Sequence, residues 1–348
     1  MTLRVGCAGA GYFSQFHIGS WQRMSRAEIV GVCDFDRDKA AVTSAPAFRT
    51  VDEMLAKTRP DILDIILPPA GHAGAIRAGL AAGVGAIICQ KPFCRDLKEA
   101  AEMVGLAASA GVPLIIHENF RFQPWFRAIK QELDSGSLGD VLQVTFRLRP
   151  GDGQGPRAYL DRQPSFQKMR RFLIHETGVH YIDVFRYLLG DASHVYADLR
   201  QINPAIAGED AGYVIFDHPL GTKALLDGNR LADHSADNTR RTMGEGLIEG
   251  SKGTLTLAGD GAVTLRPFGT QTHRQLLGPD PHDGFGGDCT HALQLHVVSG
   301  LLDDTPLENL ASDYLGVIQT EEAIYRSSET QRKVEVKAHG QRFLQTQK

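Results

Sequence analysis

Two glycines near the amino terminus are the residues whose spacing most clearly suggests chemistry. Gly9 and Gly11 follow an apolar strand that starts at Leu3, and a helix is expected from about Tyr12. The first glycine allows a tight turn, and the second lets the backbone approach a phosphate. The first N–H groups of the helix and its dipole would face that phosphate. Ser14 replaces the third glycine of this fingerprint, and its small side chain still permits close packing of helix and strand.

An acidic residue follows at the spacing expected of a dinucleotide site. The next predicted strand, residues 28–33, ends at Asp34, about twenty residues after the glycines. A carboxylate at this strand tip accepts hydrogen bonds from both ribose hydroxyls of NAD and repels the 2′-phosphate of NADP. We therefore expect NAD rather than NADP, although Arg37 could receive a 2′-phosphate. The alternative interpretation is a helix N-cap followed by a solvated run of charges over residues 34–39.

The composition excludes several classes of protein. The chain has 348 residues, enough for two domains, and a net charge of −4 without a long basic run. Neither a nucleic acid nor an anionic membrane has an electrostatic basis for binding, so a small-molecule substrate is expected. No apolar run reaches the length of a membrane span, and the amino terminus leads directly into a strand. We therefore expect a cytoplasmic protein.

The cysteines and histidines do not predict a metal site. The five cysteines are odd in number and lack paired metal-ligand spacing, and most lie in predicted buried strands. Cys94, the cysteine closest to the candidate site, would be reactive only if its pKa were lowered. His175 and His180 are one residue further apart than the histidines of the zinc-protease helix, which would place them on different helix faces.

The elements that would position these residues alternate along the first third of the chain. Strands are predicted at residues 61–67, 84–89 and 112–117, and helices at residues 51–57, 71–82 and 97–110. This order is typical of a Rossmann doubly wound parallel sheet, whose ligands bind at the carboxyl ends of the strands. Gly9, Asp34, Leu67, Gln90 and His117 lie at or beside those ends.

Beyond residue 121 the pattern changes to that of an α+β domain. After a linking helix at 125–133, strands are predicted at 141–147, 194–202, 211–216, 222–227, 244–249, 254–258 and 262–266, and helices at 176–189, 288–302 and 310–327. We expect a large, mostly antiparallel sheet with one open face, a surface that commonly mediates pairing. The predicted domains are residues 1–121 and 122–337, followed by a flexible tail at 338–348.

Several motifs together resemble the Gfo/Idh/MocA family of NAD(P)-dependent oxidoreductases over nearly the whole chain. They are Gly9 and Gly11 with His17 downstream, and the segments 68–72, 90–92, 121–124, 136–139 and 176–183. The resemblance implies that Lys91 points at the nicotinamide and the substrate, and that Glu176 and His180 complete the site. Gln90 replaces the usual glutamate of the Glu-Lys-Pro signature, and Glu176 replaces the usual aspartate. With the expected open sheet, the resemblance also implies a homodimer or homotetramer.

The proposed chemistry assigns a role to each of these side chains. Oxidation of a secondary alcohol by NAD needs a base for the hydroxyl proton, and we assign this role to His180. Glu176, one helical turn earlier, would orient the ring or stabilise its charged form. Lys91 would supply positive charge where alkoxide character develops, or would itself be the base if its pKa were lowered. The structural alternative is a helix-stabilising pair of Glu176 and His180 with Lys91 at the surface.

The complete set of predicted site residues adds several that are suggested only by their position in the sequence. The candidates for cofactor binding are Gly9, Gly11, Tyr12, Phe13, Asp34, Arg37, Leu67, Pro68, His72, Gln90 and Lys91. The candidates for substrate binding are Asn119, Arg121, Tyr159, Arg170 and His175. The arginines could bind the carboxylate of a sugar acid; alternatively, they are solvated or paired with acidic neighbours.

These predictions converge on one activity with two alternatives. We expect an NAD-dependent dehydrogenase that transfers a hydride between nicotinamide and a carbinol carbon of a sugar, inositol, related polyol or sugar acid. In the first alternative, bound NAD assists elimination or hydrolysis of a glycoside and is recycled internally. In the second, the chain is a noncatalytic nucleotide-binding regulator.

Overall fold

Six parallel strands form the first sheet, in the order β3-β2-β1-β4-β5-β6. The computed structural model describes residues 1–41, 43–282 and 285–337. The strands are β1 (Leu3–Ala8), β2 (Ala27–Cys33), β3 (Ala47–Phe48), β4 (Ile62–Ile65), β5 (Ala86–Gln90) and β6 (Leu114–His117). Every residue of β4, β5 and β6 is buried, as is typical of parallel strands between two layers of helices. The doubly wound sheet is thereby confirmed.

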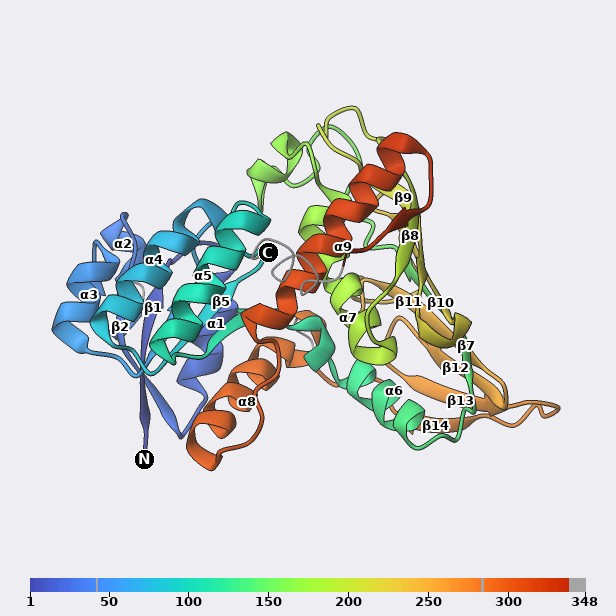
Figure 1. Cartoon of the computed structure of the whole chain (residues 1–348), viewed down its shortest axis with the longest axis horizontal. Helices are drawn as coiled ribbons and strands as arrows, with labels where there is room; N and C mark the ends of the chain where they lie inside the picture. The colour runs from blue at the N-terminus through green and yellow to red at the C-terminus, as the bar shows by residue number, and fades with distance from the viewer. Residues whose placement is uncertain (42, 283–284, 338–348) are drawn as a thin grey trace, which may run out of the picture. The chain divides into compact units, whose positions relative to one another are not determined.

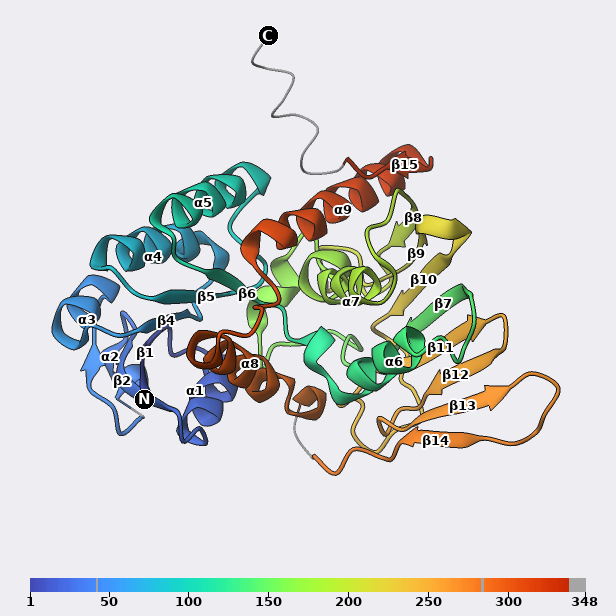
Figure 2. The same cartoon turned by 60° about the horizontal axis from the view of Figure 1, so that its bottom comes forward.

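Helices cover both faces of this sheet. They are α1 (Ser14–Gln22), α2 (Arg37–Ala40), α3 (Val51–Thr58), α4 (Pro69–Ala82) and α5 (Leu97–Ala110). Right-handed crossovers place α1 on one face and α4 and α5 on the other, as Figure 2 shows. The side chain of Asp96 caps α5 by accepting the N–H of Glu99, and Gly111 ends that helix with a positive φ of 66°.

The chain divides into two compact units, of which the first comprises residues 1–119 and 290–318. The second comprises residues 120–289 and the chain from Gln319 onward. The sequence predicted residues 290–318 in the second domain, whereas α8 (Cys289–Asp303) packs mainly with the first unit, where His291 contacts Ser20 and Gln294 contacts Asp64. Local periodicity predicts a helix but does not identify its partner. The predicted tail, 338–348, lies outside the described residues.

Nine strands form the second sheet, in the order β14-β13-β12-β11-β7-β10-β9-β8-β15. They are β7 (Val141–Leu148), β8 (His194–Arg200), β9 (Ala211–Asp217), β10 (Lys223–Asn229), β11 (Gly244–Gly250), β12 (Gly253–Leu257), β13 (Val263–Pro267), β14 (Arg274–Leu277) and β15 (Val334–Glu335). Strands β7 and β10 pair in parallel, and the other pairs are antiparallel. The mostly antiparallel sheet is therefore confirmed, with β14 and β15 as edge strands that the sequence did not predict.

Helices line one face of the second sheet. They are α6 (Pro124–Asp134), α7 (Val179–Leu189) and the carboxyl-terminal part of α9 (Ala311–Thr330), shown in Figure 1. Short 3-10 turns lie at Phe120–Phe122, Pro164–Lys168, Pro219–Gly221 and Phe285–Asp288. Buried and exposed residues alternate along β8 and β9, as expected of strands with one covered and one open face. Within the described residues, no helix combines the length and apolarity needed to cross a bilayer.

Candidate active site

The glycine-rich turn after β1 has the geometry that a pyrophosphate requires. Gly9 has a φ of +109°, and a Cβ added there would lie 2.7 Å from the carbonyl oxygen of Ile66, so only glycine fits. A Cβ added at Gly11 would meet no heavy atom within 4 Å, which leaves open space beside the backbone. This open approach at the start of α1 fits a dinucleotide phosphate. Helix α1 begins at Ser14 rather than at Tyr12, with Phe13 as its N-cap.

Asp34 lies at the carboxyl end of β2, beside this turn. Its Oδ2 atom accepts the N–H of Ala10 at 2.9 Å, and its Oδ1 atom accepts the N–H of Asp36 at 3.0 Å. The carboxylate is thus held by neutral backbone donors, and its remaining lone pairs are available to ribose hydroxyls. Arg37 is exposed on the short helix α2. The remaining acceptor positions of Asp34 therefore fit the hydroxyls of an NAD ribose.

His72 fixes the turn between β4 and α4. One ring nitrogen, Nε2, lies 2.7 Å from the carbonyl oxygen of Leu67 and donates to it. Burial lowers the pKa of His72 to about 4, so the ring is neutral at physiological pH. Pro68 accepts the N–H of Gly71 within the same turn. The backbone carbonyl groups of Leu67 and Pro68, two predicted cofactor-binding residues, are therefore fixed by hydrogen bonds within the first unit.

Lys91 follows β5, and a buried group of side chains holds its main chain. We call Gln90, His17, Asp64 and His117 the Gln90 cluster. The Gln90 side-chain oxygen accepts the N–H of Lys91 at 2.8 Å, and the Gln90 amide nitrogen lies 2.9 Å from His17 Nε2. His17 Nδ1 lies 2.8 Å from Asp64 Oδ2, which also accepts Trp21 Nε1–H at 2.7 Å. A chain of hydrogen bonds thus connects β4 to the catalytic candidate Lys91.

Cys94 does not meet the condition for a reactive thiol. It is buried, and burial is the largest cause that raises its pKa to about 12, whereas a nucleophile would need a lowered pKa. The other four cysteines are also buried and free. Among the residues that the structure describes, no group of three histidine, cysteine, aspartate or glutamate side chains is arranged to hold a metal ion.

Glu176 and His180 lie on two successive kinds of helix rather than on one. Leu173–Gly178 forms a π-helical turn that leads into α7, so Glu176 precedes the α-helix on which His180 lies. Such turns are rare and are often found at functional sites. The His180 ring is 6% exposed and stacks on Phe120, with centroids 3.9 Å apart and planes 4° apart. This stacking fixes the orientation of the imidazole.

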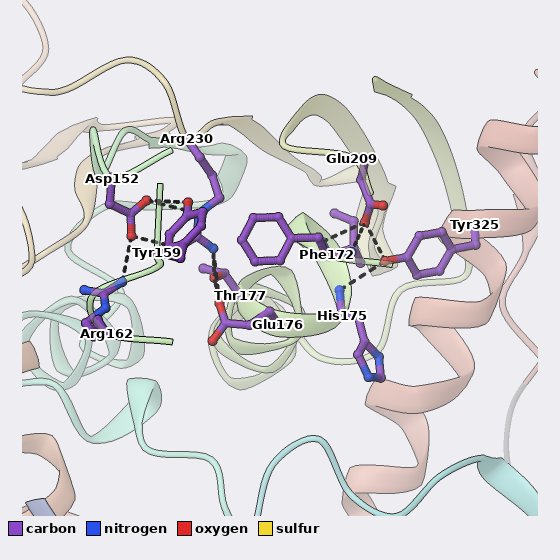
Figure 3. A network of polar contacts seen from close by, with 11 residues as sticks. Asp152, Tyr159, Arg162, Phe172, His175, Glu176, Thr177, Glu209, Arg230 and Tyr325 are labelled. Atoms are coloured by element: carbon purple, nitrogen blue, oxygen red, sulfur yellow. Dashed lines mark hydrogen bonds and ion pairs between the residues drawn. The ribbon is translucent and has the colours of Figure 1, made fainter. Parts of the chain in front are cut away.

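Arg230, which the sequence did not single out, holds the carboxylate of Glu176 (Figure 3). Its side chain is 1% exposed, and Nη1 donates to Glu176 Oε2 at 3.1 Å and to Thr177 Oγ1 at 2.6 Å. Its Nε and Nη2 atoms donate to Asp152 at 3.2 and 2.9 Å. We call Arg230, Asp152, Glu176 and Thr177 the Arg230 cluster. It connects the end of β10 to the π-turn and to the loop after β7.

The charges in the Arg230 cluster stabilise one another. Burial acts to raise the pKa of Asp152, but Arg230 outweighs this effect together with Tyr159 and Arg162, so the pKa lies below its usual value. Burial acts in the opposite direction on Arg230, and Asp152 is the first of the groups that keep its pKa above the usual value. Both side chains are therefore charged at physiological pH.

The predicted substrate-binding residues have partners within their own units. In the second unit, Arg121 forms a bidentate pair with Asp183 at 2.8 and 2.5 Å. The Tyr159 hydroxyl donates to Asp152 at 2.9 Å, and His175 Nδ1 lies 2.6 Å from Glu321 Oε1. Arg170 is exposed, and Asn119, in the first unit, donates to Thr290 at 3.3 Å. Lys91 and the predicted cofactor residues belong to the first unit, and Glu176 and His180 to the second.

Comparisons with known proteins identify the family. Residues 3–118 match the model of an oxidoreductase family with an NAD-binding Rossmann fold, and residues 126–256 match the GFO/IDH/MocA C-terminal domain. D-apiose dehydrogenase of Paraburkholderia graminis is 30% identical over 95% of this chain and 88% of its own length. Inositol 2-dehydrogenase of Rhizobium meliloti is 25% identical over 97% of this chain and 100% of its own.

A solved structure agrees with these matches over the same extent. An oxidoreductase from Agrobacterium radiobacter, determined with NAD+, L-tartaric acid and magnesium, has a TM-score of 0.87 and 25% identity, and the match covers 97% of this chain and 99% of that one. The fold, the glycine-rich turn with Asp34 and the two domain matches therefore lead to one conclusion. The chain belongs to the Gfo/Idh/MocA family of NAD-binding oxidoreductases.

Proposed function

We propose that the protein is an NAD-dependent dehydrogenase of a sugar or related polyol, and that D-apiose is the first substrate to test. The observation that carries this proposal is the 30% identity to a D-apiose dehydrogenase over 95% of the chain. The similarity to an inositol 2-dehydrogenase over 97% of the chain supports the wider class of polyhydroxylated substrates. NAD, when bound, would accept the hydride of the carbinol carbon.

The residue roles follow from their chemistry. His180 takes the hydroxyl proton, and its stacking on Phe120 presents the ring in one orientation. Lys91 donates to the reacting oxygen and stabilises negative charge there, while Gln90 holds its main chain. Glu176 stays close to Arg230 and Thr177, so it adds a fixed negative charge next to the helix of His180. We propose Glu176 as a positioning residue rather than as the base.

The ion pairs of Arg121, Arg230 and His175 favour a neutral sugar over a sugar acid, whereas Arg170 is exposed and belongs to none of these pairs. Arg121 is paired with Asp183, Arg230 with Asp152 and Glu176, and His175 with Glu321. A substrate carboxylate would have to compete with these carboxylates for their cations. A neutral hydroxyl requires only one donor or acceptor at each position, and a site built for it rejects analogues that lack it.

The decisive experiment follows nicotinamide absorbance with NAD or NADP and a panel of D-apiose, other sugars, inositols and sugar acids. We expect reduction of NAD with a neutral sugar. Lys91→Met should lower kcat at least about a hundredfold, because it removes a donor to the developing alkoxide. Lys98→Met, which changes an exposed lysine on α5, is the matched control. An unaltered rate in Lys91→Met would refute the role assigned to Lys91, whereas NAD binding by the native protein without turnover of any substrate would favour the noncatalytic regulator.

The same assay separates the elimination alternative. If the purified protein retains NAD and releases product from a glycoside without net NADH, the cofactor is recycled internally and the dehydrogenase assignment fails. Assay of glycoside cleavage alongside absorbance makes this outcome visible. Among the described residues, no contact within either unit favours elimination over simple oxidation.

We also propose that the open face of the second sheet pairs subunits in the cytoplasm. One cross-strand row on that face runs through Tyr196, Ile215, Leu225, Thr145 and Leu247. Tyr196 on β8, Ile215 on β9 and Leu247 on β11 are 37%, 40% and 38% exposed, respectively, which is a large exposure for apolar side chains of one sheet face. Light scattering should show a dimer or tetramer for the native chain and a smaller species for Ile215→Arg.

A further inference from the structure

The side chain of Gln90 has an orientation that its neighbours dictate. The N–H of Lys91 is a backbone group and can only donate, and it lies 2.8 Å from the Gln90 side-chain oxygen. The reverse orientation would put the amide N–H₂ against another donor. Gln90 is 6% exposed, so water cannot readily replace this bond. The oxygen of Gln90 is therefore committed to the main chain of Lys91.

This orientation decides which nitrogen of His17 carries the proton. The Gln90 amide nitrogen, which can only donate, lies 2.9 Å from His17 Nε2. His17 Nε2 must therefore accept and carry no hydrogen. The other ring nitrogen, Nδ1, lies 2.8 Å from Asp64 Oδ2 and donates to it. His17 is consequently a neutral imidazole with its proton on Nδ1.

The other groups around His17 agree with a neutral ring. The His117 ring lies 4.0 Å from it, and His117 Nδ1 is 3.5 Å from the Gln90 amide nitrogen, where it can accept the second amide hydrogen. Trp21 and Gln294 donate neutral N–H groups to Asp64. Burial raises the pKa of Cys7 on β1 and of Cys89 on β5, so both thiols are uncharged. Asp64 is the only charged side chain among the groups just named.

A glutamate at position 90 would change this arrangement. One carboxylate oxygen would still accept the N–H of Lys91, but the other would face His17 Nε2, which carries no hydrogen. A second proton would be needed, either on His17, between two carboxylates, or on the glutamate itself. The protonation of residues 90 and 17 would then be coupled to the hold on Lys91.

We propose that Gln90 is a positioning residue that holds Lys91 through a hydrogen-bond chain in which His17 is the neutral Nδ1–H tautomer. The chain runs from Asp64 through His17 and Gln90 to the Lys91 N–H. The native acceptor of the Lys91 N–H is an amide that does not titrate, whereas glutamate at this position would add a titrating group to the hold on Lys91. The catalytic consequence rests on the role proposed for Lys91.

The first test reads the tautomer without substrate. Nitrogen NMR of histidine-labelled, full-length protein, with and without NAD, should show a neutral Nδ1–H ring that disappears in His17→Gln. A neutral Nε2–H ring or an imidazolium for His17 at pH 7 would overturn the proposal. Because this measurement needs no turnover, its failure is distinct from a failure of the dehydrogenase assignment.

The second test separates positioning from simple support of the fold. Gln90→Met should lower kcat about tenfold to a hundredfold, because small displacements of a catalytic group are costly, with a smaller change in KM. Gln294→Met is the matched control, since Gln294 is likewise a buried amide beside this chain but donates to Asp64, whereas Gln90 is the side chain that accepts the N–H of Lys91. Equal losses of kcat in the two variants would contradict a positioning role.

Gln90→Glu keeps the acceptor for Lys91 and introduces the extra proton. We expect partial recovery of kcat relative to Gln90→Met, an additional ionisation in the pH profile of kcat, and either an imidazolium signal from His17 or a protonated carboxyl at position 90. A pH profile and a His17 signal identical to those of the native protein would overturn the proposal. If Gln90→Met does not fold, the comparison of Gln90→Glu with the native protein and the tautomer of His17 in the native protein still test the proposal.

Discussion

Asp64 in the first unit and Asp152 in the second both accept several hydrogen bonds in buried surroundings, but their donors differ. Asp64 receives neutral N–H groups from His17, Trp21 and Gln294. Asp152 receives two N–H groups from the Arg230 guanidinium, in addition to donors from Arg162 and Tyr159. The Gln90 cluster is therefore organised around one carboxylate and neutral donors, whereas the Arg230 cluster is a compensated set of full charges.

The type of donor determines how much stability each cluster loses when one donor is removed. A neutral donor that is lost from Asp64 leaves the other donors in place and no buried cation. The loss of Arg230, by contrast, removes the cation that Asp152 and Glu176 share, and breaking a buried ion pair by removing one partner is expensive. Both clusters connect distant segments, 78 and 54 residues apart around Arg230 and 73 and 47 residues apart around His17, so the type of donor and not the separation along the chain distinguishes them.

Arg230→Met should have the largest effect on stability. It should lower the free energy of unfolding by about 3–5 kcal/mol, because both carboxylates lose their buried partner. Arg162→Met is the control, since Arg162 also pairs with Asp152 but its side chain is 22% exposed, and it should cost under about 1 kcal/mol. Urea denaturation measures both. Similar losses in the two variants would show that the burial of Arg230 does not make its loss more costly than that of the more exposed Arg162.

Low pH should destabilise both units, because each contains a buried histidine that is neutral in the folded state. This effect does not depend on the Gln90 cluster or the Arg230 cluster. Burial lowers the pKa of His72 in the first unit and of His218 in the second from 6.5 to about 4. A pKa that is lower in the folded state gives stability that is fully present above pH 6.5 and is lost as the pH falls towards 4. Each histidine should cost about 2 kcal/mol by pH 5.

The matching variants separate the two contributions. His72 donates through Nε2 to Leu67, and His218 through Nδ1 to Gly190. His72→Gln and His218→Asn place an amide donor near the same positions without a group that titrates. Unfolding free energies measured between pH 4 and pH 7.5 should fall less steeply in each variant. An unchanged slope would show that the histidine is not responsible.

The sequence predicts those parts of the fold that local pattern determines. Helix α5 was predicted with its observed bounds, Leu97–Ala110, because its cap, apolar periodicity and terminal glycine are all local. The two-residue strands β3 and β15 were missed because they are too short to show alternation. The predicted helix, 176–189, includes only residues 176–178 of the π-turn Leu173–Gly178 and gives them as α-helix, since the π-helical hydrogen bonds have no signal in the apolar spacing.

The candidate site was predictable where a motif carries it and not where a distant partner does. Asp34 and Lys91 follow strands at characteristic spacing, and the Gln90 exchange is visible in the sequence itself. Arg230 has no local signal, because its partners precede it by 78 and 54 residues. For the same reason, the sequence did not show that Arg121 is paired with Asp183.

Asp34→Ala extends the comparison to a carboxylate that only backbone N–H groups hold. It should raise the Kd for NAD about tenfold, because the ribose and Ala10 lose a charged acceptor, while unfolding changes little. Asp36→Ala, on the same segment, is the control, because the Asp36 side chain pairs with Lys39 whereas the N–H of Ala10 donates to Asp34. Titration calorimetry measures both, and an unchanged Kd in Asp34→Ala would refute the cofactor assignment.

Asp64→Asn should have the smallest effect and is the sharpest test of the comparison. The amide oxygen can still accept the Nδ1–H of His17, and no cation is left unpaired, so the loss of stability should be under about 1 kcal/mol. Asp152→Asn makes the same exchange beside Arg230, where a buried guanidinium loses compensation, and should cost at least about twice as much. Urea denaturation of both variants decides. If both variants lose the same free energy of unfolding, removal of the carboxylate charge has the same consequence beside neutral donors as beside a cation. The clusters would then differ in their donors but not in their electrostatics.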